Sequence, residues 1–266
     1  MFDAVVLGLI QGLTEFIPVS SSGHMVLYHA LSSTVLSPEA ELAYDAVLQL
    51  STLLAVFVYF RKDIIELIRK FFAKEFLPII QIVIATIPAV ILGVLLKDYL
   101  TMLRGPYIVA AALIAGSVIM IYAEYFLQKK GAVSLHDNMQ ESVLSLRKAL
   151  YIGFFQVLAL IPGMSRSGMT VSGGVFNGLS REQAARFSFL ISIPIIGGSG
   201  GLKLIEAFSL EGLNFLELGV SSVVSFCAGL GAIYIFMKIV SNKNLWPFIW
   251  YRLGLAVVVI VAAVIG

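Results

Sequence analysis

Two short stretches of the chain carry side chains that could do chemistry. The first serine loop, FIPVSSSGHMV at residues 16–26, sets three serines, a glycine and His24 into an otherwise apolar sequence. The second serine loop, LIPGMSRSGMTVSGG at residues 160–174, surrounds Arg166 with glycines and hydroxyl side chains. We interpret the two loops as the halves of one polar site.

The segment that leads into the first serine loop carries an acid. Gln11 and Glu15 are four residues apart, so they share one face of a helix. A carboxylate inside a membrane segment is costly and is a functional candidate by default; the alternative is a solvated residue near a helix end. The serines Ser20, Ser21 and Ser22 can form an anion-binding nest with Gly23. His24 adds an imidazole suited to proton transfer or nucleophilic attack.

The second serine loop carries a cation. Ser165, Ser167 and Thr170 flank Arg166, whose rigid fork of N–H donors suits phosphate oxygens. The alternative is an arginine that extends to the membrane interface. Together the loops supply an acid, a histidine, an arginine and several hydroxyls, and this set is typical of phosphoryl transfer.

Composition places these loops in a membrane protein. The 266 residues are 59% hydrophobic and 13% charged, with a mean hydropathy of +0.96, whereas soluble domains are about 25% charged. The net charge of +2 does not indicate a nucleic-acid partner, and the single cysteine predicts neither a disulfide framework nor a thiolate metal site. We expect one integral membrane domain over residues 1–266.

Apolar runs predict an all-α polytopic fold. A helix needs roughly 20 apolar residues to cross a bilayer. Six runs are long enough: 41–60, 78–96, 107–127, 183–204, 215–240 and 247–265. Two shorter runs, 4–17 and 149–161, each end in a serine loop and predict re-entrant helical hairpins at 4–36 and 149–180, because irregular backbone at membrane depth must line a protein cavity.

A displacement of 145 positions aligns the two loops. It brings Gln11 onto Gln156, and it brings Ser20, Ser22 and Gly23 onto Ser165, Ser167 and Gly168. The alternative is chance among small residues of membrane helices. We predict repeat halves at about 1–127 and 149–266, joined by the polar loop 128–148.

The basic residues predict opposite insertion of the two halves. Lys and Arg favour cytoplasmic connections, and they gather between 61 and 74, between 129 and 148, and around Lys238 and Lys243. The other connections hold only Lys97, Arg104 and Lys203. The hairpin at 4–36 therefore enters from outside and that at 149–180 from the cytoplasm, the pattern of interlocked inverted-topology repeats with a site between them.

Several other polar, small and aromatic residues give weaker indications. Asp45, Gln49 and Thr52 form a stripe that either lines the pocket or is a helix-packing seam. The glycines between 197 and 201 favour close helix approach. Trp246, Trp250 and Tyr251 are typical of an interfacial aromatic belt.

The segment QGLTEF with the first serine loop, and PGMSRSGMT in the second, resemble the two signature motifs of the bacitracin-resistance family of undecaprenyl-diphosphate phosphatases. The similarity runs over essentially the whole chain. It implies a multi-pass enzyme of the bacterial cytoplasmic (inner) membrane that hydrolyses undecaprenyl diphosphate to undecaprenyl phosphate and inorganic phosphate, recycling the lipid carrier for cell-wall polymers. It also implies a site open to the outer face and a divalent cation, magnesium or calcium.

By motif position, the resemblance implies Glu15, Ser21, His24 and Arg166 as catalytic residues. It implies Glu15 and Gln11 as cation ligands. The substrate-binding residues that it implies are Gln11, Ser20, Ser22, Ser165, Ser167 and Thr170. Gln11 departs from many members, which have glutamate there, and an amide adds no charge toward a cation. The attacking group stays open among His24, Ser21 and water, as does assembly into a homodimer.

Three rival functions compete with this interpretation. A second class of lipid phosphatases shares only the SSSGH stretch, and no histidine follows SRSGM at the required distance. A lipid transporter or flippase is a more distinct alternative, because secondary transporters also build midplane sites from opposed broken helices. A structural scaffold does not account for charged loops at membrane depth.

Overall fold

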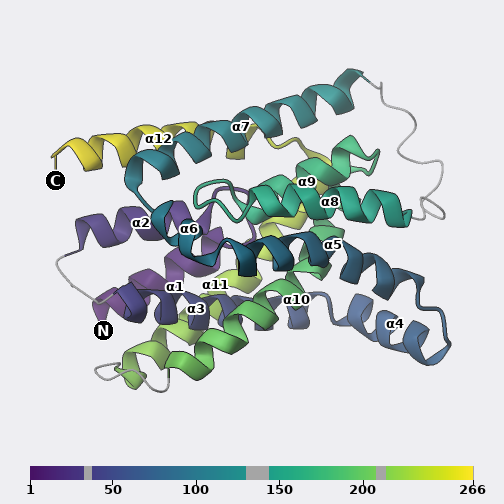
Figure 1. Ribbon diagram of the computed structural model, residues 1–266, viewed down its shortest axis with the longest axis horizontal. Coiled ribbons are helices and arrows are strands. Elements are labelled where there is room, and N and C mark those ends of the chain that lie inside the picture. The colour runs from purple at the N-terminus through teal and green to yellow at the C-terminus, as the bar shows by residue number, and fades with distance from the viewer. Residues whose placement is uncertain (33–37, 130–143, 208–213, 266) are drawn as a thin grey trace.

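The computed structural model describes residues 1–32, 38–129, 144–207 and 214–265, and the regular structure of these residues is entirely helical (Figure 1). The helices are α1 (Phe2–Thr14), α2 (Ser21–Leu31), α3 (Pro38–Tyr59), α4 (Arg61–Phe72), α5 (Leu77–Leu95), α6 (Lys97–Met102), α7 (Pro106–Lys129), α8 (Leu146–Leu158), α9 (Arg166–Phe176), α10 (Arg181–Ala207), α11 (Phe215–Asn242) and α12 (Trp246–Ile265). Residues 33–36 of the predicted hairpin 4–36 and residues 130–143 of the predicted polar loop 128–148 lie outside the described residues.

The prediction of an all-α polytopic membrane protein is confirmed. Among the described residues, five helices are long and apolar enough to cross a membrane: α5, α7, α10, α11 and α12. The sixth predicted span, 41–60, lies in α3. This helix packs against α10 and α11.

Two helical hairpins occupy the positions predicted for re-entrant segments. Helices α1 and α2 form the first and pack mainly on α11 and α12, while α8 and α9 form the second and pack mainly on α5, α7 and α10. Figure 1 shows α1 and α2 toward one end of the long axis and α8 and α9 toward the other, with both connecting loops near the middle. The hairpins therefore enter from opposite ends and present their serine loops to each other.

Small residues let each hairpin approach its neighbour closely. A Cβ on Gly12 of α1 would lie 2.6 Å from the Ala228 Cβ of α11. A Cβ on Gly153 of α8 would lie 2.8 Å from the Ala85 carbonyl oxygen of α5. Membrane helices associate through close packing of this kind, so these glycines set the depth at which each loop lies.

The two serine loops share an unusual backbone. Ser20 and Ser165 have φ values of 73° and 70°, and each caps the following helix by accepting a hydrogen bond from the N–H of the glycine three residues on. A non-glycine residue in this region costs about 1–3 kcal/mol and is typical of functional sites. The shared geometry agrees with the 145-residue displacement at these positions; the boundaries of the repeat halves stay a prediction.

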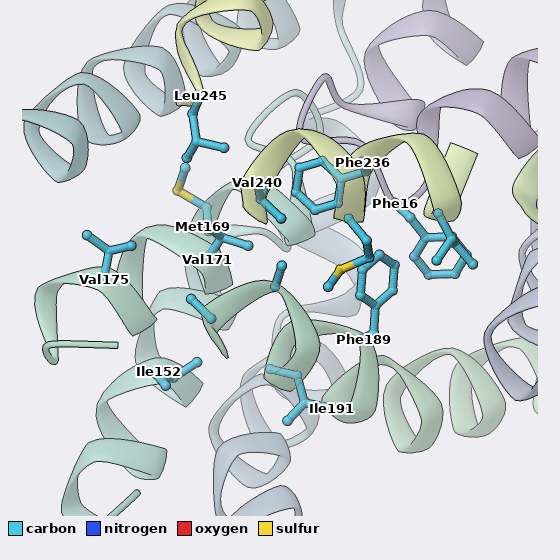
Figure 2. Packing of buried hydrophobic residues seen from close by; sticks show 14 of the residues in the cluster. Phe16, Ile152, Met169, Val171, Val175, Phe189, Ile191, Phe236, Val240 and Leu245 are labelled. Atoms are coloured by element: carbon cyan, nitrogen blue, oxygen red, sulfur yellow. The ribbon is translucent and has the colours of Figure 1, made fainter. Parts of the chain in front are cut away.

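An aromatic cluster lies beneath the loops. Phe16, immediately after Glu15, is fully buried, and its ring centroid lies 5.2 Å from that of Phe189. Phe189 in turn contacts Phe60 and Phe236. Figure 2 shows Phe16, Phe189 and Phe236 on three segments that converge in this core. The first serine loop therefore begins from a rigidly packed residue.

Candidate active site

Glu15 lies at the centre of the polar network. Its side chain is 7% exposed. Its Oε1 accepts a hydrogen bond from Nη2 of Arg166 at 3.0 Å, and its Oε2 accepts from Nε2 of Gln11 at 2.9 Å and from the Ser21 hydroxyl at 2.7 Å. The predicted acid, serine and arginine thus converge, although Arg166 is 151 residues away along the chain.

Helix geometry explains the placement of Glu15. It is the C-cap residue directly after α1, and its backbone N–H donates to the Gln11 carbonyl oxygen. Gln11 is therefore one turn earlier on the same face and orients the carboxylate with its amide. The ion pair with Arg166 joins the two hairpins through a contact shielded from water.

Arg166 is the first residue of α9 and is not fully satisfied by its protein partners. Its guanidinium carbon lies 5.5 Å from the centroid of the Phe16 ring, so the cation rests on an aromatic face. Nη2 binds Glu15, whereas Nη1 is buried and finds no acceptor among the described residues. Such a donor is suited to an anionic oxygen of a ligand.

The remaining serines hold the loops together. The hydroxyls of Ser20 and Ser22 lie 3.2 Å apart, as do those of Ser165 and Ser167. The loops also meet directly, because the Gly163 N–H donates to the Ser22 hydroxyl at 3.1 Å. The loops are therefore linked by two contacts, one ionic and one through backbone.

A cavity of about 310 Å³ opens beside this network. The serine loops contribute Ser20, Ser21, Ser22, Leu160, Ser165 and Arg166 to its lining, and the surrounding helices and their ends contribute Glu15, Gln49, Ala89, Gln156, Ala159, Ile195, Ile196, Ser199 and Lys203. The mixture of polar loops and apolar helix walls suits a ligand with a charged head and an apolar tail.

Gln156 is a cavity residue that the sequence did not single out as functional. Its Nε2 donates to the Ala85 carbonyl oxygen at 3.1 Å, close to Pro88, which lies inside α5 and cannot donate a backbone hydrogen bond. Its Oε1 is buried and has no donor among the described residues. The signal for it was present, because the 145-residue displacement pairs Gln156 with Gln11.

The polar stripe on α3 is partly pocket lining and partly a helix-packing seam. Gln49 lines the cavity, whereas Asp45 forms an ion pair with Arg104 at 3.6 Å. Thr52 is fully buried, and its hydroxyl donates to the Gln49 carbonyl oxygen at 2.7 Å. Gly200 serves helix approach as predicted, since a Cβ there would lie 2.8 Å from Leu50.

His24 lies outside the residues that line the cavity. A carbonyl oxygen can only accept, so Nδ1 donates to the Ser20 carbonyl at 2.8 Å, and Nε2 then accepts from the Tyr251 hydroxyl at 2.7 Å. The two rings also stack, with centroids 5.6 Å apart. Tyr251 therefore does more than the predicted interfacial belt requires: its hydroxyl holds the first serine loop.

Three predicted binding residues act from behind the cavity. Gln11 is buried against Glu15, and Ser167 is buried against Ser165. The Thr170 hydroxyl contacts the Arg166 carbonyl oxygen at 2.8 Å and the Ser188 hydroxyl at 2.6 Å. These side chains position the groups that face the cavity.

The donor set fits a divalent cation only in part. Among the described residues, no group of three or more His, Cys, Asp or Glu side chains is placed to hold a metal ion. The cavity offers one carboxylate, serine hydroxyls and the buried Oε1 of Gln156. These are hard oxygen ligands of the kind that bind Mg²⁺ or Ca²⁺, and Mg²⁺ commonly uses one or two carboxylates with substrate phosphates.

Comparison with known proteins identifies this arrangement. A family model described as "Bacitracin resistance protein BacA" matches residues 4–258, a region that contains both serine loops. The chain belongs to the BacA family. In this BacA chain the match extends from α1 into α12, so the hairpins and the helices that enclose them lie within the region shared by the family.

Named relatives agree with the family assignment. The BacA chain is 38% identical to "Undecaprenyl-diphosphatase 2" of Streptomyces avermitilis over 98% of its own length and 94% of that protein. It is 36% identical to "Undecaprenyl-diphosphatase" of Idiomarina loihiensis over 96% of both chains. A Streptomyces coelicolor protein, also named "Undecaprenyl-diphosphatase 2", is 38% identical over all of this chain.

Proposed function

We propose that this protein is an undecaprenyl-diphosphatase, which hydrolyses undecaprenyl diphosphate to undecaprenyl phosphate and inorganic phosphate. The observation that carries the proposal is the convergence of Glu15, Ser21 and Arg166 from opposed hairpins at one cavity. Full-length relatives with this name support the substrate, and the apolar walls of the cavity suit a lipid tail. The reaction recycles the lipid carrier for cell-wall polymers, in keeping with a bacitracin-resistance family.

Arg166 receives the diphosphate. Its buried Nη1 donates to an oxygen of the terminal phosphate while Nη2 keeps its bond to Glu15. The guanidinium then opposes the negative charge that the phosphoryl group carries through transfer. The Ser20, Ser22 and Ser165 side chains border the same space.

Ser21 is the nucleophile that the geometry favours over His24. Its hydroxyl already donates to Oε2 of Glu15 at 2.7 Å, within the range for transfer of its proton. The Ser21 Oγ bonds to the terminal phosphorus, the bond from that phosphorus to the bridging oxygen breaks, and undecaprenyl phosphate leaves. Glu15 takes the serine proton and returns it to the leaving phosphate.

Water completes the reaction. Glu15, again a carboxylate, takes a proton from a water molecule that attacks the phosphoserine, and the bond between Ser21 Oγ and phosphorus breaks. Inorganic phosphate leaves, and the proton returns to Ser21. General acid–base catalysis of this kind contributes roughly 10²- to 10⁴-fold in rate.

A divalent cation, magnesium or calcium, belongs to the proposal. Glu15 is the direct carboxylate ligand that the cavity offers, and Gln11 orients it. When bound, the cation neutralises phosphate charge. Because Glu15 is shared with Arg166, we propose that the substrate phosphates supply much of the cation's coordination.

We further propose that the enzyme works in the cytoplasmic membrane with its cavity toward the outer face. Lys203 lines the cavity and belongs to one of the connections poor in basic residues, which predicts that side as external. Whether the protein pairs into a homodimer stays open, as it does from the sequence.

The test is phosphate release by detergent-solubilised protein given undecaprenyl diphosphate. Hydrolysis needs no membrane gradient, so the wild-type protein should turn over in micelles, while Ser21→Ala should lose about 10²-fold or more in kcat. Acid-stable label trapped from terminally labelled substrate would identify phosphoserine, since phosphohistidine is acid-labile.

Two results would contradict the proposal. A folded protein that binds the lipid but releases no phosphate in micelles would favour the transporter alternative. A Ser21→Ala variant with wild-type kcat would remove Ser21 from the reaction and return the choice to His24 or water.

A further inference from the structure

Arg252 of α12 is a charged residue buried in the membrane-spanning part of the protein. Its side chain has 0% exposure, and no described carboxylate forms an ion pair with it. Its Nε donates to the Ser117 hydroxyl at 3.1 Å, and its Nη2 donates to the carbonyl oxygens of Leu113 and Gly163, each at 3.1 Å. A cation at this depth marks a functional role by default.

Gly163 transmits this contact to both serine loops. It lies in the second serine loop with φ of 101°, a conformation that glycine adopts readily. Its carbonyl oxygen accepts from Arg252, while its N–H donates to the Ser22 hydroxyl of the first serine loop. Arg252 and Ser22 therefore bind the two peptide units on either side of the Gly163 Cα, so a shift of Arg252 moves the residue to which the first serine loop is bound.

The guanidinium fits a space that a glycine of α7 leaves open. A Cβ on Gly116 would lie 2.3 Å from Nη2 of Arg252 and 2.9 Å from the Met164 carbonyl oxygen. The smallest possible added side chain would thus displace the guanidinium without altering its charge. Helices α7 and α12 pack against each other along this contact.

The residue before Arg252 holds the other hairpin. Tyr251 donates its hydroxyl to Nε2 of His24, which is fixed at Nδ1 to the Ser20 carbonyl oxygen. Two consecutive residues of α12 therefore reach the first and the second serine loops, one each. Neither side chain lines the cavity.

We propose that Tyr251 and Arg252 are positioning residues that hold the two serine loops in the register in which Glu15, Ser21 and Arg166 meet. The kinetic consequence of this proposal rests on the proposed function. Its structural consequence rests on the hydrogen bonds alone. In this arrangement His24 acts as a neutral Nδ1–H tautomer that ties α12 to the first serine loop.

Kinetics of Arg252→Met and Gly116→Ala test the second contact. Misplacement of reacting groups by about 1 Å costs roughly 10²-fold in rate, so we expect both variants to lower kcat by that order while KM stays near its wild-type value. The matched control is Glu124→Met with Arg181→Met, which removes another interhelical arginine, bound bidentately to a fully buried glutamate near Leu245. The control should lose thermal stability and retain kcat.

Hydrogen–deuterium exchange tests the same contact without substrate. Peptides that contain Gly163 and Gly23 should exchange faster in Arg252→Met and Gly116→Ala, and as slowly as in the wild type in the control. Unchanged exchange at both loops in both variants would overturn the proposal. An inactive wild-type preparation that still shows the predicted exchange would instead count against the proposed function alone.

Nitrogen-15 spectra of histidine-labelled protein test the first contact. The chain has three histidines, and the His24 signals can be assigned by their loss in His24→Gln. The wild type should show an Nδ1–H tautomer, and Tyr251→Phe should move the Nε2 signal because that nitrogen loses its donor. An Nε2–H tautomer in the wild type would overturn the role of Tyr251. So would an Nε2 signal that Tyr251→Phe moves no further than does Tyr122→Phe, a control at an exposed tyrosine.

Discussion

Ser21 and Arg166 occupy equivalent positions of the two serine loops, 145 residues apart, yet they have opposite chemistry. Each follows a capping serine of positive φ and begins a helix. Glu15 is matched in the second loop by Leu160, which lines the cavity as an apolar residue. A shared backbone thus presents a hydroxyl and an acid from one side and a guanidinium from the other.

At the residue scale, Gln11→Glu tests how the site handles a cation. The Gln11 amide donates to Glu15 at 2.9 Å, so a carboxylate there would face another carboxylate and repel it unless a cation or proton lies between. We expect the variant to bind Mg²⁺ more tightly, by about tenfold in Kd, since each 1.4 kcal/mol is a factor of ten. Titration calorimetry with Mg²⁺ alone measures this directly.

The expected gain in Mg²⁺ affinity depends on where the new carboxylate is placed. Gln156→Glu adds the same charge on the opposite hairpin, where the wild-type amide bonds to the Ala85 carbonyl oxygen instead of to Glu15. Tighter Mg²⁺ binding by Gln11→Glu than by Gln156→Glu would support Glu15 as the direct ligand. Equal or weaker binding by Gln11→Glu would place the cation elsewhere.

Residue types in the motifs predicted the centre of the site but not its supports. Glu15, Ser21 and Arg166 were identifiable because charge and hydroxyls are conspicuous in an apolar chain. Tyr251 and Arg252 were harder to assign, because their partners lie more than 80 residues away and include backbone carbonyls, which have no sequence signal. An arginine inside the last apolar span was nevertheless a visible clue.

At the element scale, the depth of α1 against α11 determines where Glu15 lies. A Cβ on Gly12 would lie 2.6 Å from both the Ala228 Cβ and the Ser225 carbonyl oxygen, so one helix must move. We expect Gly12→Ala to destabilise the protein by about 1–3 kcal/mol, as overpacking does, and to lower kcat because the end of α1 shifts. Thermal melting in detergent and phosphate release measure the two effects.

The matched control is Gly231→Ala on α11, where an added Cβ meets nothing within 4 Å. It should leave both melting temperature and kcat close to wild type. If Gly12→Ala behaved like Gly231→Ala, close packing of α1 on α11 would not set the position of Glu15.

Element types followed from hydropathy, because long apolar runs must be helical in a bilayer. The hairpins followed from the short runs that end in serine loops. Hydropathy marked 41–60 as a span, and α3 (Pro38–Tyr59) covers nearly all of that run. Because hydropathy averages over faces, it did not separate the roles of Asp45 and Gln49, which meet Arg104 and the cavity.

At the scale of the whole molecule, charge predicts orientation. Helix α4 has no buried residue and begins the group of basic residues that the sequence predicts to be cytoplasmic. We therefore expect Glu75→Cys to react with a membrane-impermeant maleimide only after cells are permeabilised, and Gly105→Cys to react in intact spheroplasts. Both belong in a Cys227→Ser background, because Cys227 is exposed.

Labelling of Glu75→Cys from outside with protection of Gly105→Cys would reverse the orientation. The cavity with Lys203 would then open to the cytoplasm, and the enzyme would act on lipid in the inner leaflet. Simultaneous labelling of both positions in intact spheroplasts would show leaky membranes, which the Cys227→Ser parent with a known cytoplasmic cysteine reporter controls.

The unequal loops have a consequence for ancestry. In a symmetric pair of identical half-chains, two copies of the first loop would supply two acids and no arginine, and two copies of the second would supply two arginines and no acid, because Glu15 is matched by Leu160 and Arg166 by Ser21. Gene duplication followed by fusion releases each copy from that symmetry, since one half can then lose its acid as the other keeps it. Two identical copies of either present half would therefore lack the ion pair between Glu15 and Arg166, because each half carries only one of its two members.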